Sequence, residues 1–260
     1  MIPIAIYHCS IKIVSRGKGK SAVAAAAYRA GEKLTNEWDG LTHDYTRKGG
    51  VVHSEILLPP QAPPSFSDRS TLWNSVEEAE KSNNAQLARE VEIALPVELS
   101  REEQIRLVRE YCSSQFVSKG MCADFNIHDT GGGNPHAHIL LTMRPMDERG
   151  KWLPKSKKEY VLDENGERVK LPSGRYKTRK VDLVDWNNQE NAEVWRKAWA
   201  GPGRPSDFGK AVGDLPAPAF LCDPFRSRRG AFVLWKCDHP LCGPLPEGHT
   251  FVQCAYHKTG

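Results

Sequence analysis

The sequence lacks the long apolar runs that membrane proteins and secreted precursors need. No apolar stretch approaches the ~20 residues of a membrane-spanning helix, and the first residues do not resemble a secretory signal. Instead, residues 2–14 alternate between apolar and polar positions, as a half-buried β-strand does. We therefore predict a cytoplasmic protein without a membrane segment.

Cysteine pairs of the kind that stabilise secreted domains are missing as well. The first three cysteines, Cys9, Cys112 and Cys122, have no evident pairing partners. This usage is typical of a reducing compartment. The 39% share of hydrophobic residues in 260 is modest but sufficient for one core, so the length suits one domain with an appendage.

Acidic residues are absent between His8 and Gly31. This segment instead contains five basic residues: Lys12, Arg16, Lys18, Lys20 and Arg29. Residues 149–180 form a second basic segment, with eleven Lys or Arg against four Asp or Glu. The net charge is only +4, so these two segments are local concentrations of positive charge. They indicate either a polyanionic partner such as nucleic acid or simply a solvated basic face.

The order of apolar patterns predicts an α+β fold, in which one sheet has helices packed on it. Strands are expected at residues 2–14, 51–60, 89–96 and 122–128, and from His136 onwards. Helices are expected at residues 22–34, 67–88, 100–120 and 181–200. Within residues 160–171, the Asn165-Gly166 pair predicts a hairpin.

The character of the chain changes at Gly201, which separates a domain of residues 1–200 from an irregular tail of residues 201–260. The tail is rich in Gly and Pro and shows no helical period. Near its end it contains four residues with some likeness to zinc half-sites: Cys237, Cys242, Cys254 and His257. The alternative is a tail without zinc and without a stable fold, including one translated from a non-ancestral reading frame.

The most informative motif is His136-Ala137-His138, with His128 eight residues before it. Side chains alternate faces along a strand, so His136 and His138 point the same way. If the glycine-rich segment between His128 and His136 is a tight connection, these two residues lie opposite each other, with Cβ atoms ~5 Å apart. The trio then forms a three-imidazole metal site, although a one-residue slip in register would separate His128 from it.

A metal site beside basic surfaces suggests phosphodiester chemistry, and Tyr28 is a candidate nucleophile. It lies in the Ala-rich helix that directly follows the first basic segment. A free tyrosine has a pKa of about 10, and a divalent ion can offset the cost of forming phenolate by polarising the phosphate. The residues alone leave a second interpretation open, in which Tyr28 is a half-buried aromatic that packs its helix onto the sheet.

Residues 1–200 resemble the MobA/MobL family of plasmid mobilisation relaxases, which belong to the histidine-hydrophobe-histidine endonucleases. The matching segments are residues 6–34, SEILLP, residues 88–100, FNIHDTGGGNPHAHILLTMRP and DWNNQENAEVWRKAW, in family order. The resemblance implies a largely antiparallel central sheet. It also implies an enzyme that nicks one strand at a plasmid origin of transfer and becomes linked through Tyr28 to the 5′ phosphate.

The resemblance also implies roles for the other site residues. His128, His136 and His138 would hold Mg²⁺ or Mn²⁺, and three imidazoles favour Mn²⁺ or another transition metal. Glu90 would orient a ligand imidazole or accept the tyrosine proton, with Glu92 as the second choice. His8 and His53 are interpreted as ordinary polar strand residues.

The implied partners are single-stranded origin DNA and other mobilisation and transfer-apparatus proteins of a bacterial plasmid. The five basic residues near Tyr28 are expected to contact DNA phosphates, and the second basic segment would cover single-stranded DNA. Relatives usually continue the last helix into a long C-terminal region, so a truncated relaxase is expected here. The alternatives are an impaired remnant that only binds origin DNA, a rolling-circle replication initiator and a plain metallohydrolase.

Overall fold

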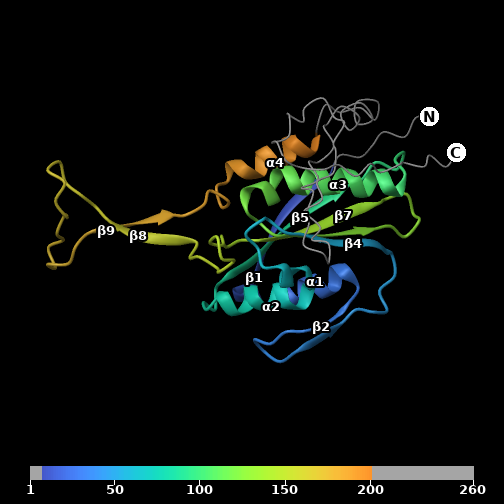
Figure 1. Cartoon of the computed structure of the whole chain (residues 1–260), viewed down its shortest axis with the longest axis horizontal. Coiled ribbons are helices and arrows are strands. Elements are labelled where there is room, and N and C mark those ends of the chain that lie inside the picture. The colour runs from blue at the N-terminus through green and yellow to red at the C-terminus, as the bar shows by residue number, and fades with distance from the viewer. Residues whose placement is uncertain (1–7, 201–260) are drawn as a thin grey trace, which may run out of the picture. The chain divides into compact units, whose positions relative to one another are not determined.

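The computed structural model describes residues 8–200, and its centre is a five-stranded sheet (Figure 1). Its strands, in spatial order, are β1 (Cys9–Ser15), β5 (Gln86–Ala94), β7 (His136–Thr142), β6 (Ala123–His128) and β4 (Val51–Leu57). Every neighbouring pair in this sheet is antiparallel. The predicted α+β fold with an antiparallel central sheet is therefore confirmed.

Two pairs of helices cover the two faces of the sheet (Figure 1). On one face lie α1 (Ala22–Ala30) and α2 (Arg69–Ala79), and on the other lie α3 (Arg101–Gln115) and α4 (Glu190–Ala200). The core beneath α1 and α2 includes Val14 of β1, which pairs with Ala88 of β5, and Leu140 of β7. This apolar patch covers only part of the face, because the same strand positions become polar further along.

The alanine-rich helix α1 has a well-defined start and end. The Ser21 hydroxyl accepts a hydrogen bond from the amide of Ala24 and satisfies one of the unpaired donors of the first turn. Gly31 adopts a left-handed conformation with φ of 67° and ends the helix. The helix is thus shorter than predicted, and the sequence pattern missed the small hairpin that follows, made of β2 (Lys33–Thr35) and β3 (Thr42–Asp44).

Other boundaries also differ from the sequence prediction. Helix α2 ends at Ala79 rather than at residue 88, because Leu87 and Ala88 are buried in strand β5. Helix α3 begins with the predicted capping box of Ser100 and Glu103, but it ends at Gln115. Helix α4 begins at Glu190, and its Trp195 packs edge-on against another buried aromatic ring.

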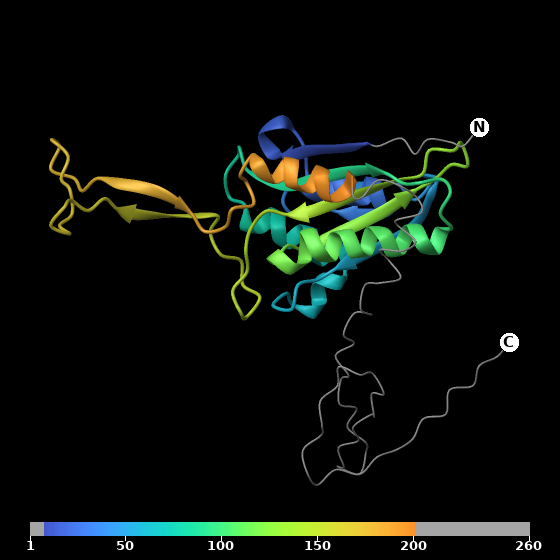
Figure 2. The same ribbon diagram turned by 90° about the horizontal axis from the view of Figure 1, so that it is seen from above.

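The second basic segment forms a two-stranded ribbon that extends away from the sheet (Figures 1 and 2). Strand β8 (Ser156–Tyr160) pairs with β9 (Thr178–Asp182). The predicted hairpin around Asn165-Gly166 is present beyond the ribbon's main ladder as a turn with a bridge between Leu162 and Arg168 and a hydrogen bond from the amide of Asp163 to the carbonyl of Glu167 at 2.9 Å. The pattern therefore identified the turn but missed the longer pairing.

Two predictions fall partly or wholly outside the described residues. These are the strand expected from residue 2 and the tail of residues 201–260, including its zinc candidates Cys237, Cys242, Cys254 and His257. Within residues 8–200, no helix has the length and apolar character needed to span a membrane.

Candidate functional site

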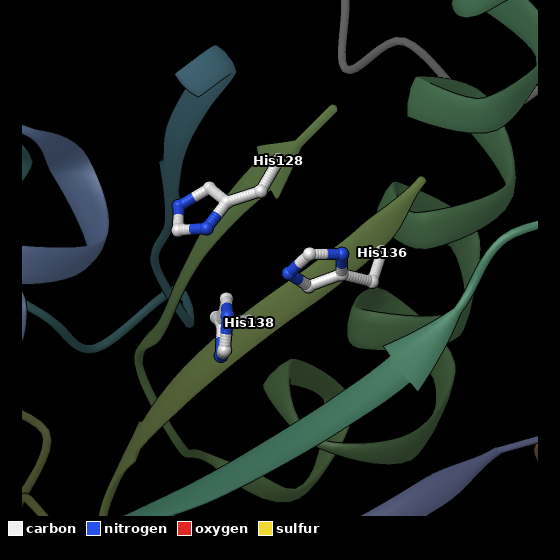
Figure 3. Close-up of side chains that lie close together, drawn as sticks. All are labelled: His128, His136 and His138. Carbon is white, nitrogen blue, oxygen red and sulfur yellow. The ribbon is translucent and has the colours of Figure 1, made fainter. Parts of the chain in front are cut away.

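The three histidines lie together on neighbouring strands (Figure 3). His128 of β6 pairs directly with His136 of β7, so the predicted register is confirmed, and His138 lies two positions along on the same face. One ring nitrogen of each imidazole lies within 4.8 Å of the others. Metal–nitrogen bonds are about 2.1 Å long. Side-chain rotations that bring the three nitrogens closer together would therefore let a single metal ion bind all of them.

Each imidazole uses one nitrogen for a hydrogen bond to an oxygen that can only accept. His128 donates through Nε2 to the main-chain oxygen of Arg29 at 2.6 Å. His136 and His138 donate through Nδ1 to the main-chain oxygen of Asn134 at 2.9 Å and to the Glu90 carboxylate at 3.0 Å. These bonds fix the tautomers and leave the second nitrogen of each ring available, the arrangement typical of metal-binding histidines.

The electrostatics of the site keep the key groups in the forms that metal binding requires. Burial lowers the pKa of His128 to about 4, so its imidazole is neutral near pH 7. Glu90 is buried, which by itself raises its pKa, but the hydrogen bond from His138 and the charge of Arg29 lower it to about 2. The carboxylate is therefore ionised and can hold His138 in place. Three imidazole donors suit a transition-metal ion better than Mg²⁺.

The two predicted acids have different surroundings. Glu90 accepts hydrogen bonds from His138 and from Arg29, whose Nε lies 2.8 Å from Oε1. Glu92 pairs across the sheet with His138 and forms an ion pair with Lys12 at 2.9 Å. Both acids can approach His138, but only Glu90 is hydrogen-bonded to a ligand histidine.

Tyr28 lies on α1 next to the histidines rather than in the core. The neighbouring residue, Arg29, provides the carbonyl that His128 contacts. Tyr28 is 48% exposed, which suits both an accessible nucleophile and a half-buried packing aromatic. Its ring contacts Tyr45 edge-on, with centroids 5.2 Å apart, and Lys48, whose Nζ is 3.9 Å from the ring centroid.

The five basic residues expected to contact DNA fall into two groups. Lys12, Lys18 and Lys20 are exposed, although Lys12 also pairs with Glu92. Arg16 and Arg29 are instead held within the protein. The Arg16 guanidinium binds the carboxylate of Glu77 at 2.7 Å, and that of Arg29 binds Glu90. Most donors of the two guanidiniums are thus used inside the fold, and only Nε of Arg16 has no hydrogen-bond partner among the described residues. These two arginines are therefore less suited than the exposed lysines to contact DNA phosphates.

His8 and His53, interpreted from the sequence as ordinary polar residues, lie outside the trio. His53 of β4 pairs with Glu55 at 2.9 Å, and the exposed His8 lies 4.0 Å from Glu92. The residue that sequence reasoning missed is Lys48. It follows Arg47 in a turn and has no periodic or motif signal, so only its place beside Tyr28 distinguishes it.

A model of the MobA/MobL family matches residues 20–202, which include helix α1 and all three histidines. The chain belongs to the MobA/MobL family. It is 44% identical over 182 residues to the conjugal transfer protein TraA of Rhizobium radiobacter, covering 66% of this chain and 16% of that relative. It is also 43% identical over 164 residues to the mobilization protein MobL of Acidithiobacillus ferridurans, covering 54% of this chain and 43% of that protein.

A solved structure resembles this MobA/MobL chain with a TM-score of 0.63 and 35% sequence identity. The likeness covers 75% of this chain and 89% of the other, which was described in work on the "Molecular Basis of Vancomycin Resistance Transfer in Staphylococcus aureus". The chain spans about a sixth of the length of the TraA relative. The similarity is therefore to one part of a larger protein.

Proposed function

We propose that residues 1–200 form the nicking domain of a DNA relaxase, which cuts one strand at a plasmid origin of transfer for conjugative mobilisation. Family membership and the names of the relatives support a role in mobilisation. The observation that carries the chemistry is the hydrogen bond from His128 to the carbonyl of Arg29. It joins the three-imidazole face to the residue next to an exposed tyrosine.

In the proposed reaction, the Tyr28 hydroxyl oxygen attacks the phosphorus of the scissile phosphodiester. The phenol gives up its proton, a bond forms between that oxygen and phosphorus, and the bond between phosphorus and the 3′ oxygen breaks. The 3′ oxygen leaves with a proton as a free hydroxyl, and the 5′ phosphate remains on the tyrosine. Because the phosphodiester energy is retained in this link, the 3′ hydroxyl can reattack and rejoin the strand.

The residues of the site would divide the work between them. His128, His136 and His138 would hold a divalent ion, which would supply polarisation of the phosphate and stabilisation of developing charge. Glu90 would hold the imidazole of His138 in its metal-binding orientation. Glu90 is less suited to accept the tyrosine proton, because its low pKa makes it a weak base.

Single-stranded DNA is the proposed substrate, and two exposed basic regions support it. Lys18 and Lys20 lie in the loop before α1, and the β8–β9 ribbon presents cations such as Lys158 and Lys180. By extension, the protein would act in the bacterial cytoplasm with other mobilisation and transfer-apparatus proteins encoded by the plasmid.

The test is covalent capture of DNA. The protein would be incubated with Mn²⁺ and labelled single-stranded oligonucleotides that tile the DNA beside its own gene. We expect an adduct that survives denaturation in the wild type and is lost in Tyr28→Phe. Tyr111→Phe is the matched control, because it removes a hydroxyl on the opposite face of the sheet that bonds to Trp195 at 2.9 Å. It should retain the adduct.

Other outcomes would favour the alternative functions. Binding without any adduct would favour an impaired domain that only grips origin DNA. Cleavage that persists in Tyr28→Phe would favour a metallohydrolase. An adduct that persists in Tyr28→Phe would indicate a different tyrosine, as expected for a replication initiator.

A further inference from the structure

The turn of residues 45–48 packs against the C-terminal end of α1, directly beside Tyr28. The amide of Tyr45 donates to the carbonyl of Glu32 at 3.1 Å, and the amide of Lys48 donates to the carbonyl of Tyr45 at 2.9 Å. The turn lies close to Gly31, where a Cβ would be 3.7 Å from the carbonyl of Lys48, an ordinary contact distance. The turn is therefore held at a fixed place relative to the last turn of the helix.

Lys48 makes two contacts with the same residue. Its Nζ donates a hydrogen bond to the main-chain oxygen of Tyr28 at 2.8 Å and lies 3.9 Å from the centroid of the Tyr28 ring. A cation over an aromatic face is attracted by the ring quadrupole. The Tyr45 ring meets the same ring edge-on, with an interplanar angle of 88°. The orientation of Tyr28 is thus restrained by an ammonium group on its face and by a second aromatic ring.

Within the described part of the chain, the lysine has no acidic partner to explain its position. Among residues 8–200, no carboxylate forms an ion pair with Lys48. The charged group that affects the pKa of Lys48 is Arg29, which has the same sign. Burial and Arg29 lower the pKa of Lys48 to about 8, so holding the ammonium here is unfavourable. A partly buried cation that is retained at a cost, beside a reactive group, is characteristic of functional sites.

We propose that Lys48 is a positioning residue for the nucleophile, which orients the Tyr28 ring and places positive charge on the ring face during attack. This inference rests on the proposed function of Tyr28. As the phenol oxygen loses its proton, negative charge spreads into the ring. A cation already fixed over the ring stabilises that charge without reorganisation. Fixing the ring also keeps the oxygen in an attacking geometry.

The experiment compares full-length Lys48→Met and Lys48→Arg with the wild type in two measurements, the affinity for the single-stranded oligonucleotide and the rate of adduct formation at saturating DNA. Methionine retains the chain length without charge, whereas arginine retains both the donor and the cation. We expect Lys48→Met to slow adduct formation about tenfold, with little change in affinity, and Lys48→Arg to restore most of the rate. Lys33→Met is the matched control, because Lys33 is exposed and pairs weakly with Asp44 at 3.7 Å.

A second measurement does not depend on activity. In the fluorine NMR spectrum of protein labelled with 3-fluorotyrosine, the Tyr28 signal is identified by its loss in Tyr28→Phe. Lys48→Met should shift and sharpen that signal as the ring gains freedom, and Lys33→Met should leave it unchanged. Because this signal reports the ring alone, it identifies loss of positioning even if a variant is less stable.

The outcomes separate this inference from the proposed function. If wild type forms no adduct, the proposed function fails, and the inference fails with it. If wild type forms the adduct and Lys48→Met forms it at the same rate, only the role of Lys48 is overturned. A loss of DNA affinity with an unchanged rate would instead make Lys48 a phosphate contact.

Discussion

His128 makes the contact that joins the two parts of the proposed site. Its Nε2 binds a carbonyl at the end of α1, and its free nitrogen faces His136 and His138 (Figure 3). The neutral imidazole is required for metal binding, since a protonated ring has no lone pair for a metal. Glu90 likewise accepts the hydrogen bond from Nδ1 of His138.

The first prediction concerns pH and the stability of metal-free protein. The unfolded imidazole of His128 has a pKa of 6.5 and takes up a proton below that value, whereas the folded one, at about 4, does not. Stability from this group is present above pH 6.5 and lost as pH falls towards 4. Between about pH 7 and pH 5 the free energy of unfolding should drop by about 2 kcal/mol. Urea denaturation with a chelator present measures it.

The control for this prediction is His128→Gln, which removes the titrating group. Its loss of stability over the same pH interval should be smaller than that of the wild type by the same ~2 kcal/mol. An equal pH dependence in both proteins would show that other groups account for the change.

The second prediction tests which acid supports the metal ligands. Glu90→Gln removes the charge that His138 donates to, and it should weaken Mn²⁺ binding by about 10–100-fold. Glu92→Gln is the matched control and should change the affinity much less, because Glu92 mainly pairs with Lys12. Titration calorimetry would measure both. The reverse order of effects would transfer the supporting role to Glu92.

At the scale of elements, the β8–β9 ribbon has a charge pattern that is unfavourable in isolation. Lys158 and Lys180 lie directly opposite each other across the pair of strands, and the exposed ion pair of Lys180 with Asp182 at 3.0 Å offsets only part of their repulsion. Like charges at such positions destabilise a hairpin. Arg168 adds a further cation, 4.1 Å from the centroid of the Tyr160 ring. A bound polyanion would relieve this repulsion, which supports the proposal that the ribbon binds DNA.

The third prediction follows from this pattern. Replacing Lys158 and Lys180 with glutamine should weaken binding of single-stranded DNA and make it less dependent on salt. The slope of log affinity against log salt should fall by about 0.7 for each lysine that contacts a phosphate. Lys197→Gln on α4 is the control, since its exposed side chain lies 3.6 Å from Glu193 on the same helix. An unchanged slope in the double variant would remove the ribbon from the DNA surface.

At the scale of the whole molecule, a buried charge network ties α2 to the sheet. Asp124 of β6 is fully buried and accepts hydrogen bonds from Arg69 Nε at 2.8 Å and from Trp73 Nε1 at 2.9 Å. Arg69 also bonds to the hydroxyl of Ser54 on β4 at 2.7 Å. The network lies in the same sheet face as the histidines, two strand positions from Asn126, which pairs with His138.

The fourth prediction is that Asp124→Ala strongly destabilises the fold. It would leave the Arg69 guanidinium buried without its main partner, and breaking such a pair costs about 3–5 kcal/mol. Arg109→Ala, which breaks the exposed pair with Glu55 at 2.8 Å, should cost less than about 1 kcal/mol. Denaturant unfolding followed by tryptophan fluorescence compares them. Similar losses in both variants would contradict the role given to the network.

Local sequence determined the strands that carry the histidines and their pairing. Side chains alternate along a strand, and the connection between His128 and His136 is short, so the register followed from the pattern. The start of α1 at Ser21 was likewise predictable from its capping residue. Element ends were less accurate, because the burial of Leu87 in the sheet overrides the helical preference of the segment before it.

Only the tertiary structure decided which groups meet across the fold. His128 and Arg29 are 99 residues apart, and their contact depends on the position of β6 in the sheet and on how α1 packs over it. The same packing turned Arg16 inward to Glu77 and placed Lys48 over Tyr28. Local patterns encode which face a side chain occupies, but partners from distant segments are set by the burial of the whole core, which no short stretch of sequence contains.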